Sequence, residues 1–260
     1  MGKCKSMMMI LLVRHHSDGR ASTSLQKFYP RLLELLNQLK DKDGVIPLLT
    51  TKQQDEMKAR TIQVKPSDDR RRAAVLVLLC SVHDEPSILL TKRAAHLTNH
   101  AAEMAFVGGH YDDESDRSLM DTALREAHEE LLPNPQLFSP SFRACVQILG
   151  ECTPLPSLRG IPVTPVIAML ERPDLTLPLK DYFPGDPSEV DTVLAVSIRD
   201  LIQKETTHQL PDNPFRLVDA PVYPTPHGDV WGLTAYILRP LLRRIFRPTF
   251  APEESSSTSV

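Results

Sequence analysis

The sequence has few of the residues that mark several common classes of protein. It contains 4 cysteines in 260 residues, and none forms a Cys-x-x-Cys pair, which excludes zinc-ribbon spacing and gives no disulfide framework. A reducing compartment is therefore expected. The net charge of -3 provides no broad basic face, so nucleic acid is not an expected partner. The apolar runs, such as residues 7–13, are too short to cross a bilayer as a helix.

Glycine is also scarce, with 10 residues, which makes the adjacent pair Gly108-Gly109 noticeable. The glycine-rich loops of P-loop and dinucleotide-binding proteins are absent, as are the GxSxG serine elbow and the HExxH zinc motif. Apolar residues nevertheless make up 41% of the chain and charged residues 24%. This composition is sufficient for a globular core.

The first two dozen residues are poor in acids. They carry one aspartate, Asp18, against four basic residues, Lys3, Lys5, Arg14 and Arg20. A basic, serine-bearing, acid-poor start is typical of a mitochondrial presequence, which we prefer. The same stretch matches the N-myristoylation pattern through Gly2 and Ser6, with Cys4 as a candidate palmitoylation site. A mobile start in a cytoplasmic protein is the third alternative.

Hydrophobic patterning predicts a mixed arrangement of strands and helices. Apolar runs of strand length occur at residues 73–82, 87–93, 103–106, 142–152, 161–170 and 192–198, and Asp84-Glu85-Pro86 predicts a hairpin between the first two. Helices are expected at residues 28–39, 119–132, 199–204 and 231–246. The order of elements predicts an α+β fold with helices packed on a mixed sheet.

Four segments follow from this pattern. Residues 1–40 form the N-terminal segment with one helix, and the polar residues 41–72 form a connecting arm. Residues 73–246 form the folded domain, and residues 247–260 a low-complexity tail expected to be disordered.

The helix after Gly108-Gly109 concentrates acidic side chains. Apolar residues recur every four positions and predict its buried stripe: Leu119, Ala123, Ala127 and Leu131. Ser118 is positioned to cap its start. Glu126 and Glu130 flank the stripe one turn apart with Glu129 beside them, so three carboxylates are expected to converge.

A bound cation would offset the repulsion among these carboxylates. Ligands that offer only oxygen suit hard ions such as Mg²⁺ or Mn²⁺, and Mg²⁺ usually shares its shell with substrate phosphates. Arg125 is placed to brace one carboxylate through a bidentate pair. A solvated acidic helix face is the competing interpretation.

The order strand, Gly-Gly, acidic loop and acidic helix resembles the signature of Nudix hydrolases. Its helical half stands here as Arg125-Glu126-Ala127-His128-Glu129-Glu130. The resemblance implies an α/β/α sandwich and a metal-dependent diphosphatase. It also implies that Glu126, Glu129 and Glu130 are metal ligands, that one of them is a candidate base, and that Gly109 is the loop glycine and Arg125 the bracing arginine.

A longer resemblance points to the coenzyme A diphosphatase branch of that superfamily. The segment LLTKRAAHLTNHAAEMAFVGG, residues 89–109, is similar to the motif found upstream of the box in that branch. It implies that Arg93, Phe106, Gly108 and Gly109 contact a small-molecule substrate, coenzyme A or an acyl derivative. The sequence departs from the pattern at four positions: Thr98 replaces an arginine, Ala102 and Leu132 replace glycines, and Val107 replaces a proline.

Several assignments stay open at this stage. The loop from Gly109 to the helix is longer than usual, so Asp112, Glu114 and Asp116 compete for the place of the signature's loop acid. Glu189 and Glu151 are candidates for a fourth carboxylate from a later loop. Another diphosphate substrate, such as ADP-ribose, a nucleotide sugar or a dinucleoside polyphosphate, is the first alternative function. A Nudix-shaped binding module is the second.

Overall fold

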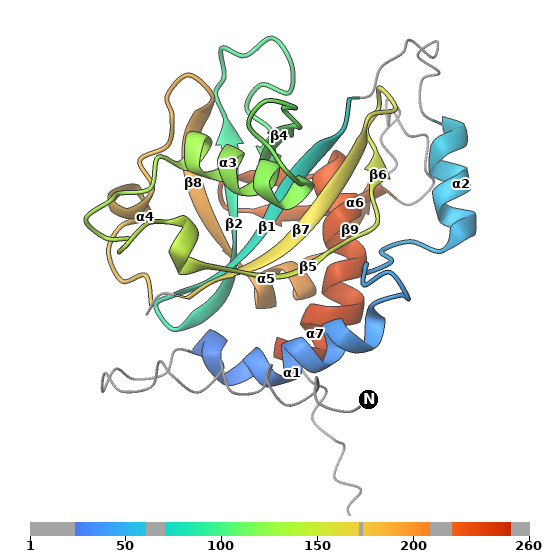
Figure 1. Cartoon of the computed structure of the whole chain (residues 1–260), viewed down its shortest axis with the longest axis horizontal. Helices are drawn as coiled ribbons and strands as arrows, with labels where there is room; N and C mark the ends of the chain where they lie inside the picture. Colours follow the sequence, from blue (N-terminus) through green and yellow to red (C-terminus); the bar gives the residue numbers. More distant parts are fainter. Residues whose placement is uncertain (1–23, 61–70, 172–173, 209–219, 251–260) are drawn as a thin grey trace, which may run out of the picture.

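The computed structural model describes residues 24–60, 71–171, 174–208 and 220–250 (Figure 1). At its centre lies β1 (Ala73–Val82), whose apolar run was expected as a buried strand. Its side chains alternate between two separate hydrophobic clusters. Val77 and Leu79 lie in one cluster, whereas Leu76, Leu78 and Cys80 lie in the other. The strand is therefore covered on both faces, which explains why it is apolar throughout rather than at every second position.

The strands around β1 form one mixed sheet. The main path runs β3 (Met104–Ala105), β2 (Glu85–Arg93), β1, β7 (Pro162–Leu170), β5 (Val146–Glu151). Three further strands join it, because β4 (Val107–His110) pairs with β1, β6 (Leu155–Pro156) with β7 and β8 (Val190–Ser197) with β2. The β1–β7 pair is parallel and its neighbours are antiparallel. The expected β1–β2 hairpin is confirmed.

Helices cover both faces of this sheet (Figure 1). One face packs against α3 (Leu119–Leu131) and the short α4 (Leu179–Tyr182). The other packs against α1 (Ser24–Leu39), α5 (Ile198–Gln203), α6 (Gly232–Leu241) and the π-helical turn η3 (Leu242–Phe246). The chain therefore has the α/β/α sandwich with a mixed sheet that the sequence resemblance implied. A small second sheet consists of β9 (Thr206–His208), β10 (Ala220–Thr225) and β11 (Gly228–Val230).

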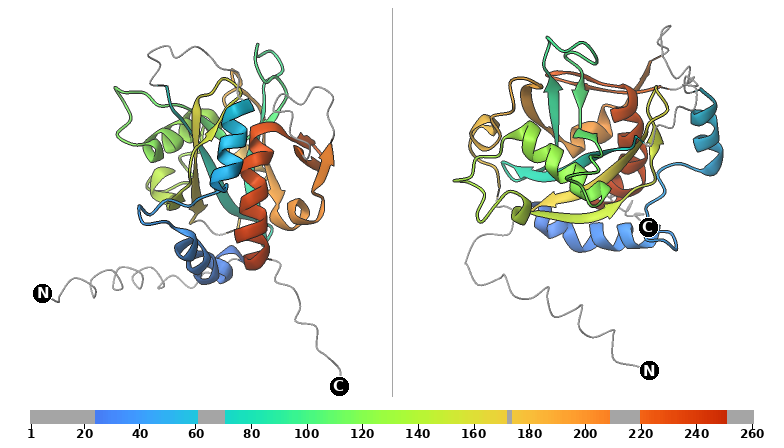
Figure 2. Two further views of the ribbon diagram at one scale, coloured as in Figure 1. Left: turned by 90° about the vertical axis from the view of Figure 1, so that its right-hand side faces the viewer. Right: turned by 45° about the horizontal axis from the view of Figure 1, so that its top comes forward.

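The N-terminal and C-terminal segments differ from their predictions in detail. Helix α1 is part of the core, with Leu25, Leu32 and Leu36 buried. It lies beside α7 (Arg247–Phe250), which continues the chain directly after α6 and η3 (Figure 2). The predicted connecting arm contains a helix that was not predicted from the sequence, α2 (Thr51–Arg60). The targeting signals predicted within residues 1–23 and most of the predicted tail lie outside the described residues. In the described part of the chain, no helix has both the length and the apolar character needed to cross a bilayer.

The glycine pair also lies in a different element from the one expected. A single short strand was predicted at residues 103–106, with the glycines following it. The structure has two strands, β3 and β4, and places Gly108 and Gly109 inside β4. There they pair with Val75 and Ala74 of the central strand. The glycines are thus held by the sheet, directly beneath the helix that bears the carboxylates.

Candidate active site

Helix α3 is fixed at both ends by local hydrogen bonds. At its start, the Ser118 hydroxyl accepts a hydrogen bond from the backbone N–H of Asp121, as the sequence predicted. At its end, Leu132 adopts a left-handed conformation with φ +47°, and its N–H donates to the His128 carbonyl. This is the conformation that glycine usually provides after a helix. Leu132 therefore occupies a glycine position in geometry as well as in sequence.

Glu126 and Glu130 face the glycine pair. The backbone N–H of Gly108 donates to Oε1 of Glu130 over 3.1 Å. A Cβ atom built on Gly109 would lie 2.4 Å from the carboxyl carbon of Glu126. Any side chain at position 109 would therefore displace that carboxylate. The two glycines form a cradle for the two carboxylates, and Gly109 is required for the space it leaves.

Burial makes the Glu130 carboxylate unusual. The residue is 4% exposed, and burial raises the pKa of Glu130 from 4.5 to about 7, against the lowering effect of the Gly108 hydrogen bond. The charge of Glu189 raises it further, while Arg93 lowers it. Burial also raises the pKa of Glu126, partly offset by Arg125. Two carboxylates held in this way strongly favour a nearby positive charge.

Arg125 supplies one such charge. Its Nε and Nη2 atoms donate to the two oxygens of Asp116 over 2.9 and 3.0 Å, in a bidentate pair. Its Nη1 atom lies 2.9 Å from Glu129 and 3.0 Å from Glu126. Nη2 also donates to the His110 carbonyl. The predicted bracing role of this arginine is thus visible in its contacts, and its main partner is an aspartate.

Asp116 is the loop acid that meets Arg125. Its side chain is almost fully buried and accepts further hydrogen bonds from the Thr122 hydroxyl and the Asp112 backbone N–H. The hydrogen bonds from Arg125 hold the pKa of Asp116 well below its usual range. Asp112 instead closes a tight turn, accepting from Glu114 N–H and Ser115 Oγ. Neither acid therefore points freely toward a ligand, and both shape the loop.

The three helix carboxylates are not gathered around one point. In the described part of the chain, no three side chains of His, Cys, Asp or Glu are arranged to hold a metal ion. The expectation that all three converge is met by Glu126 and Glu130, while Glu129, whose side chain is 56% exposed, binds Arg125. The physical reason is Arg125, whose positive charge lies 2.9 Å from Glu129 and offsets the charge of that carboxylate, whereas the other two carboxylates would repel it. Binding of one ion by all three requires Glu129 to leave Arg125.

The residues present nevertheless fit a hard divalent ion. The donors are oxygens only, Glu126 and Glu130 are desolvated, and Gly109 leaves room beside the Glu126 carboxylate. Nearby, the Nε atom of Arg93 is buried and has no hydrogen-bond partner among the described residues. A buried donor of this kind is suited to an anionic ligand. The site thus combines cation-binding and anion-binding groups.

Of the residues at 89–109 that were predicted to contact substrate, Arg93 lies near the carboxylates and Phe106 does not. Arg93 ends β2 and lies near enough to Glu130 to affect its pKa. Phe106, predicted to contact substrate, is 5% exposed and packs in the core on the α6 face of the sheet. It therefore lies on the face of the sheet opposite α3, which carries the carboxylates. Between these two residues, Ala102 has φ +58°, a left-handed conformation that is strained for alanine.

Of the later acids, Glu189 approaches the site and Glu151 does not. Glu189 is exposed on the loop before β8 (residues 185–190), and its charge raises the pKa of both Glu126 and Glu130. Glu151 ends β5, opposite Val166 of β7. Sequence spacing alone gave no reason to choose between them.

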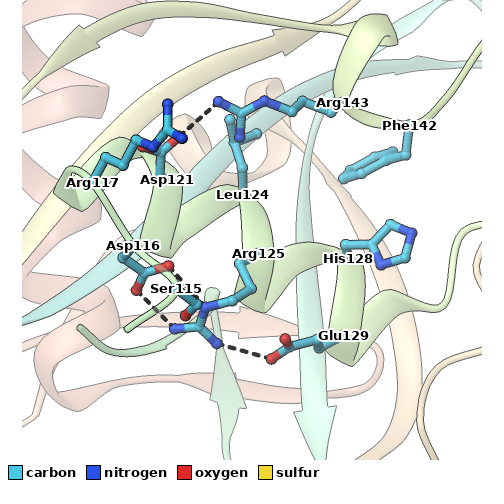
Figure 3. A pocket seen from close by; sticks show the side chains of 10 residues that line it. All are labelled: Ser115, Asp116, Arg117, Asp121, Leu124, Arg125, His128, Glu129, Phe142 and Arg143. Carbon is cyan, nitrogen blue, oxygen red and sulfur yellow. Dashed lines mark hydrogen bonds and ion pairs between the residues drawn. The ribbon is translucent and has the colours of Figure 1, made fainter. Parts of the chain in front are cut away.

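A cavity of about 510 Å³ lies on another side of α3 (Figure 3). Successive residues of a helix are 100° apart, so Leu124 and His128, which line the cavity, point away from Glu126. Its wall contains two ion pairs: Arg143 donates to Asp121 over 2.6 Å, and Arg125 donates to Asp116 over 2.9 Å. Arg125 and Glu129 separate the cavity from the cradle of Glu126 and Glu130.

Comparisons with known proteins agree with this geometry. The sequence pattern of the NUDIX domain matches residues 70–217. A relative from Enterobacter sp. (strain 638), described as "Uncharacterized Nudix hydrolase NudL", is 36% identical over 179 residues, which cover 68% of this chain and 84% of the relative. A protein of the same description from Yersinia pestis (strain Pestoides F) is 35% identical over 183 residues, covering 69% and 82%.

Solved structures of similar proteins include a MutT/nudix family protein from Enterococcus faecalis. It is 15% identical, with a TM-score of 0.39, and the match covers 88% of this chain and 75% of that one. The NUDIX domain of Shewanella oneidensis NrtR, solved with ADP ribose, is 18% identical with a TM-score of 0.37, covering 60% and 88%. The family match spans more than half of the chain and includes both the glycine pair and the acidic helix. The chain therefore belongs to the Nudix family and is a Nudix hydrolase.

Proposed function

We propose that this Nudix hydrolase cleaves the diphosphate bond of coenzyme A or an acyl-coenzyme A. The observation that carries the proposal is the path of residues 89–109, which resemble the coenzyme A motif. This segment runs along β2, turns, and returns through β3 and β4, so that Arg93 and the glycine pair both lie near Glu130 of the acidic helix. One end provides the buried Nε atom of Arg93, and the other the Gly108 N–H that holds Glu130.

The proposed reaction is a hydrolysis. The oxygen of a water molecule bonds to one phosphorus, and the bond from that phosphorus to the bridging oxygen breaks. The products are (acyl-)4'-phosphopantetheine and adenosine 3',5'-bisphosphate. A divalent ion, when bound, supplies neutralisation of the diphosphate charge and lowers the pKa of water. No serine or cysteine nucleophile is required.

We assign the following roles to the side chains of the site. Glu126, Glu129 and Glu130 hold Mg²⁺ or Mn²⁺, as oxygen donors suited to these ions. Arg93 donates to a phosphate oxygen through its unpartnered Nε atom. Glu189 takes the proton from water, because it is exposed, lies near Glu126 and Glu130, and forms no ion pair among the described residues.

A substrate panel tests the function. Purified protein with Mg²⁺ or Mn²⁺ is assayed against coenzyme A, acetyl-coenzyme A, ADP-ribose, a nucleotide sugar and a dinucleoside polyphosphate, with products identified by mass. We expect the coenzyme A compounds to have the highest kcat/KM. If ADP-ribose is cleaved as well as coenzyme A, the narrower assignment fails while the hydrolase remains. Glu130→Gln should lower turnover by at least ~100-fold, and a normal metal-dependent rate would contradict the assigned role.

The compartment is a separate proposal. The acid-poor start, residues 1–23, supports a mitochondrial address rather than an N-myristoylated or cytoplasmic location. A fusion of residues 1–39 to a fluorescent reporter tests it. Reporter outside mitochondria would contradict it, and a Gly2→Ala variant that changes the location would favour myristoylation.

A further inference from the structure

The loop that carries Glu189 is fastened to the end of the acidic helix. Gly185 N–H donates to the Leu131 carbonyl over 3.0 Å, and Asp186 N–H to the Glu130 carbonyl over 2.8 Å. The last carbonyls of a helix have no partner within it. The 185–190 loop therefore satisfies them, and its first residues move with the helix that bears the carboxylates.

The same loop is fastened on its other side to the segment that joins β2 to β3. Ala94 N–H donates to the Glu189 carbonyl over 2.8 Å. The Nε2 atom of His96 lies 3.1 Å from the Ser188 carbonyl oxygen. A carbonyl only accepts, so His96 donates and its Nε2 atom carries a proton. Two consecutive carbonyls, at positions 188 and 189, are thus held from one segment.

These contacts control the direction of the Glu189 side chain. Asp186 also fixes the turn, because its Oδ1 atom accepts from both Ser188 N–H and Ser188 Oγ. Val190, the next residue, begins β8 and is buried. The peptide between Ser188 and Glu189 is held through both of its polar groups: its N–H donates to the Asp186 carbonyl over 3.0 Å, and its carbonyl is the one that His96 holds.

We propose that His96 is a positioning residue for Glu189. Its hydrogen bond to the Ser188 carbonyl orients the peptide from which the Glu189 carboxylate extends toward Glu126 and Glu130. The inference deepens the proposed function, on which it rests, since Glu189 there takes the proton from water. The segment between β2 and β3 thereby positions a reacting group, in addition to any contact with substrate.

The expected effect is that of one neutral hydrogen bond. Its loss corresponds to a rate change of about three- to tenfold. The effect is confined to kcat, because His96 contacts neither Arg93 nor the glycine cradle. His100 provides a matched control: it lies on the same segment and is exposed, but it pairs with Glu103 over 2.9 Å and not with the 185–190 loop.

The test is a double-mutant cycle measured with the best diphosphate substrate and Mn²⁺ under single-turnover conditions, which keep slow variants measurable. We expect His96→Ala to lower the rate about three- to tenfold with an unchanged substrate dependence. His96→Gln, which keeps an N–H at the same distance from the backbone, should restore most of it, and His100→Ala should have no effect. In a Glu189→Gln background, His96→Ala should change nothing further.

Two results with the His96 variants would overturn the inference. One is a normal rate for His96→Ala. The other is an equal decrease with and without the Glu189 carboxylate, which would show that His96 acts elsewhere. Either result leaves the proposed function intact, because that function is decided by the substrate preference of the unsubstituted protein. A normal rate for Glu189→Gln would remove the role of both residues.

Discussion

Replacement of Glu130 by glutamine should stabilise the metal-free protein while abolishing its activity. Burial raises the pKa of Glu130 from 4.5 to about 7, so the fold prefers the protonated acid. The protonated form of Glu130 stabilises the fold. This stabilisation is complete at pH values below the pKa of glutamate in the unfolded chain, 4.5, and it is lost as the pH rises through the pKa in the folded protein, about 7. At pH 8.5 the ionised side chain therefore opposes folding, and a neutral glutamine of the same shape does not.

The size of the effect follows from the shift. A rise from 4.5 to about 7 corresponds to about 3 kcal/mol between pH 4.5 and pH 8.5. Glutamine keeps an oxygen to accept the Gly108 N–H, but its amide N–H groups need new partners, at a cost of about 1 kcal/mol or more. We therefore expect Glu130→Gln to raise the free energy of unfolding by about 1–2 kcal/mol at pH 8.5 and to leave it unchanged at pH 5. Each kcal/mol is about 2–4 °C in Tm for a chain of this size.

Thermal unfolding in EDTA at pH 5 and pH 8.5 measures this difference. Glu129→Gln is the control, because that side chain is half exposed and paired with Arg125, and it should show no gain. With Mn²⁺ present the unsubstituted protein should unfold at a higher temperature than Glu130→Gln, because it binds the ion more tightly and a ligand stabilises the native state that binds it. If Glu130→Gln is no more stable at pH 8.5, or gains equally at both pH values, burial is not the source of the shift.

Three further substitutions test other parts of the site. Leu132→Gly should raise the free energy of unfolding by about 1 kcal/mol, measured in urea, because it relieves a left-handed residue that is 43% exposed; destabilisation would contradict this. Gly109→Ala should lower turnover at least ~10-fold and weaken Mn²⁺ binding measured by calorimetry, without unfolding, since its Cβ would meet the Glu126 carboxylate. Asp116→Asn should destabilise the protein at pH 7 by about 1–3 kcal/mol. The Asp116 pKa is lowered by Arg125, so this difference should shrink as the pH falls below 3.8 in acid unfolding, and a constant difference would argue against the ion pair.

The main elements of the fold could be predicted from local sequence because their signals are local. The unbroken apolar run of residues 73–80 specifies β1, and Ser118 specifies the start of α3. The strands β9 to β11 were missed because they are short and rich in proline and polar residues, and they are formed by pairing with one another. Helix α2 was missed because it has no apolar stripe.

The site was predictable in its residue types but not in its pairing. The signature placed Glu126, Glu129 and Glu130 on one helix, which the structure confirms. Which loop acid meets Arg125 depends on the path of the connection at residues 111–118, where Asp112, Glu114 and Asp116 competed for the place. The approach of Glu189 depends on the hydrogen bond from the Asp186 N–H to the carbonyl of Glu130, a residue far away in the sequence, and no sequence periodicity predicts such a contact.

Helix α1 sets a limit on how the chain can be shortened. Three of its leucines are buried against the core, and each buried leucine is worth about 1.5–3 kcal/mol. Any shortening of the chain from its N-terminus must therefore stop before Ser24 if the protein is to keep its fold. For the same reason, a recombinant protein cut to the family match at residues 70–217 would lose both α1 and α6, and we expect it to aggregate.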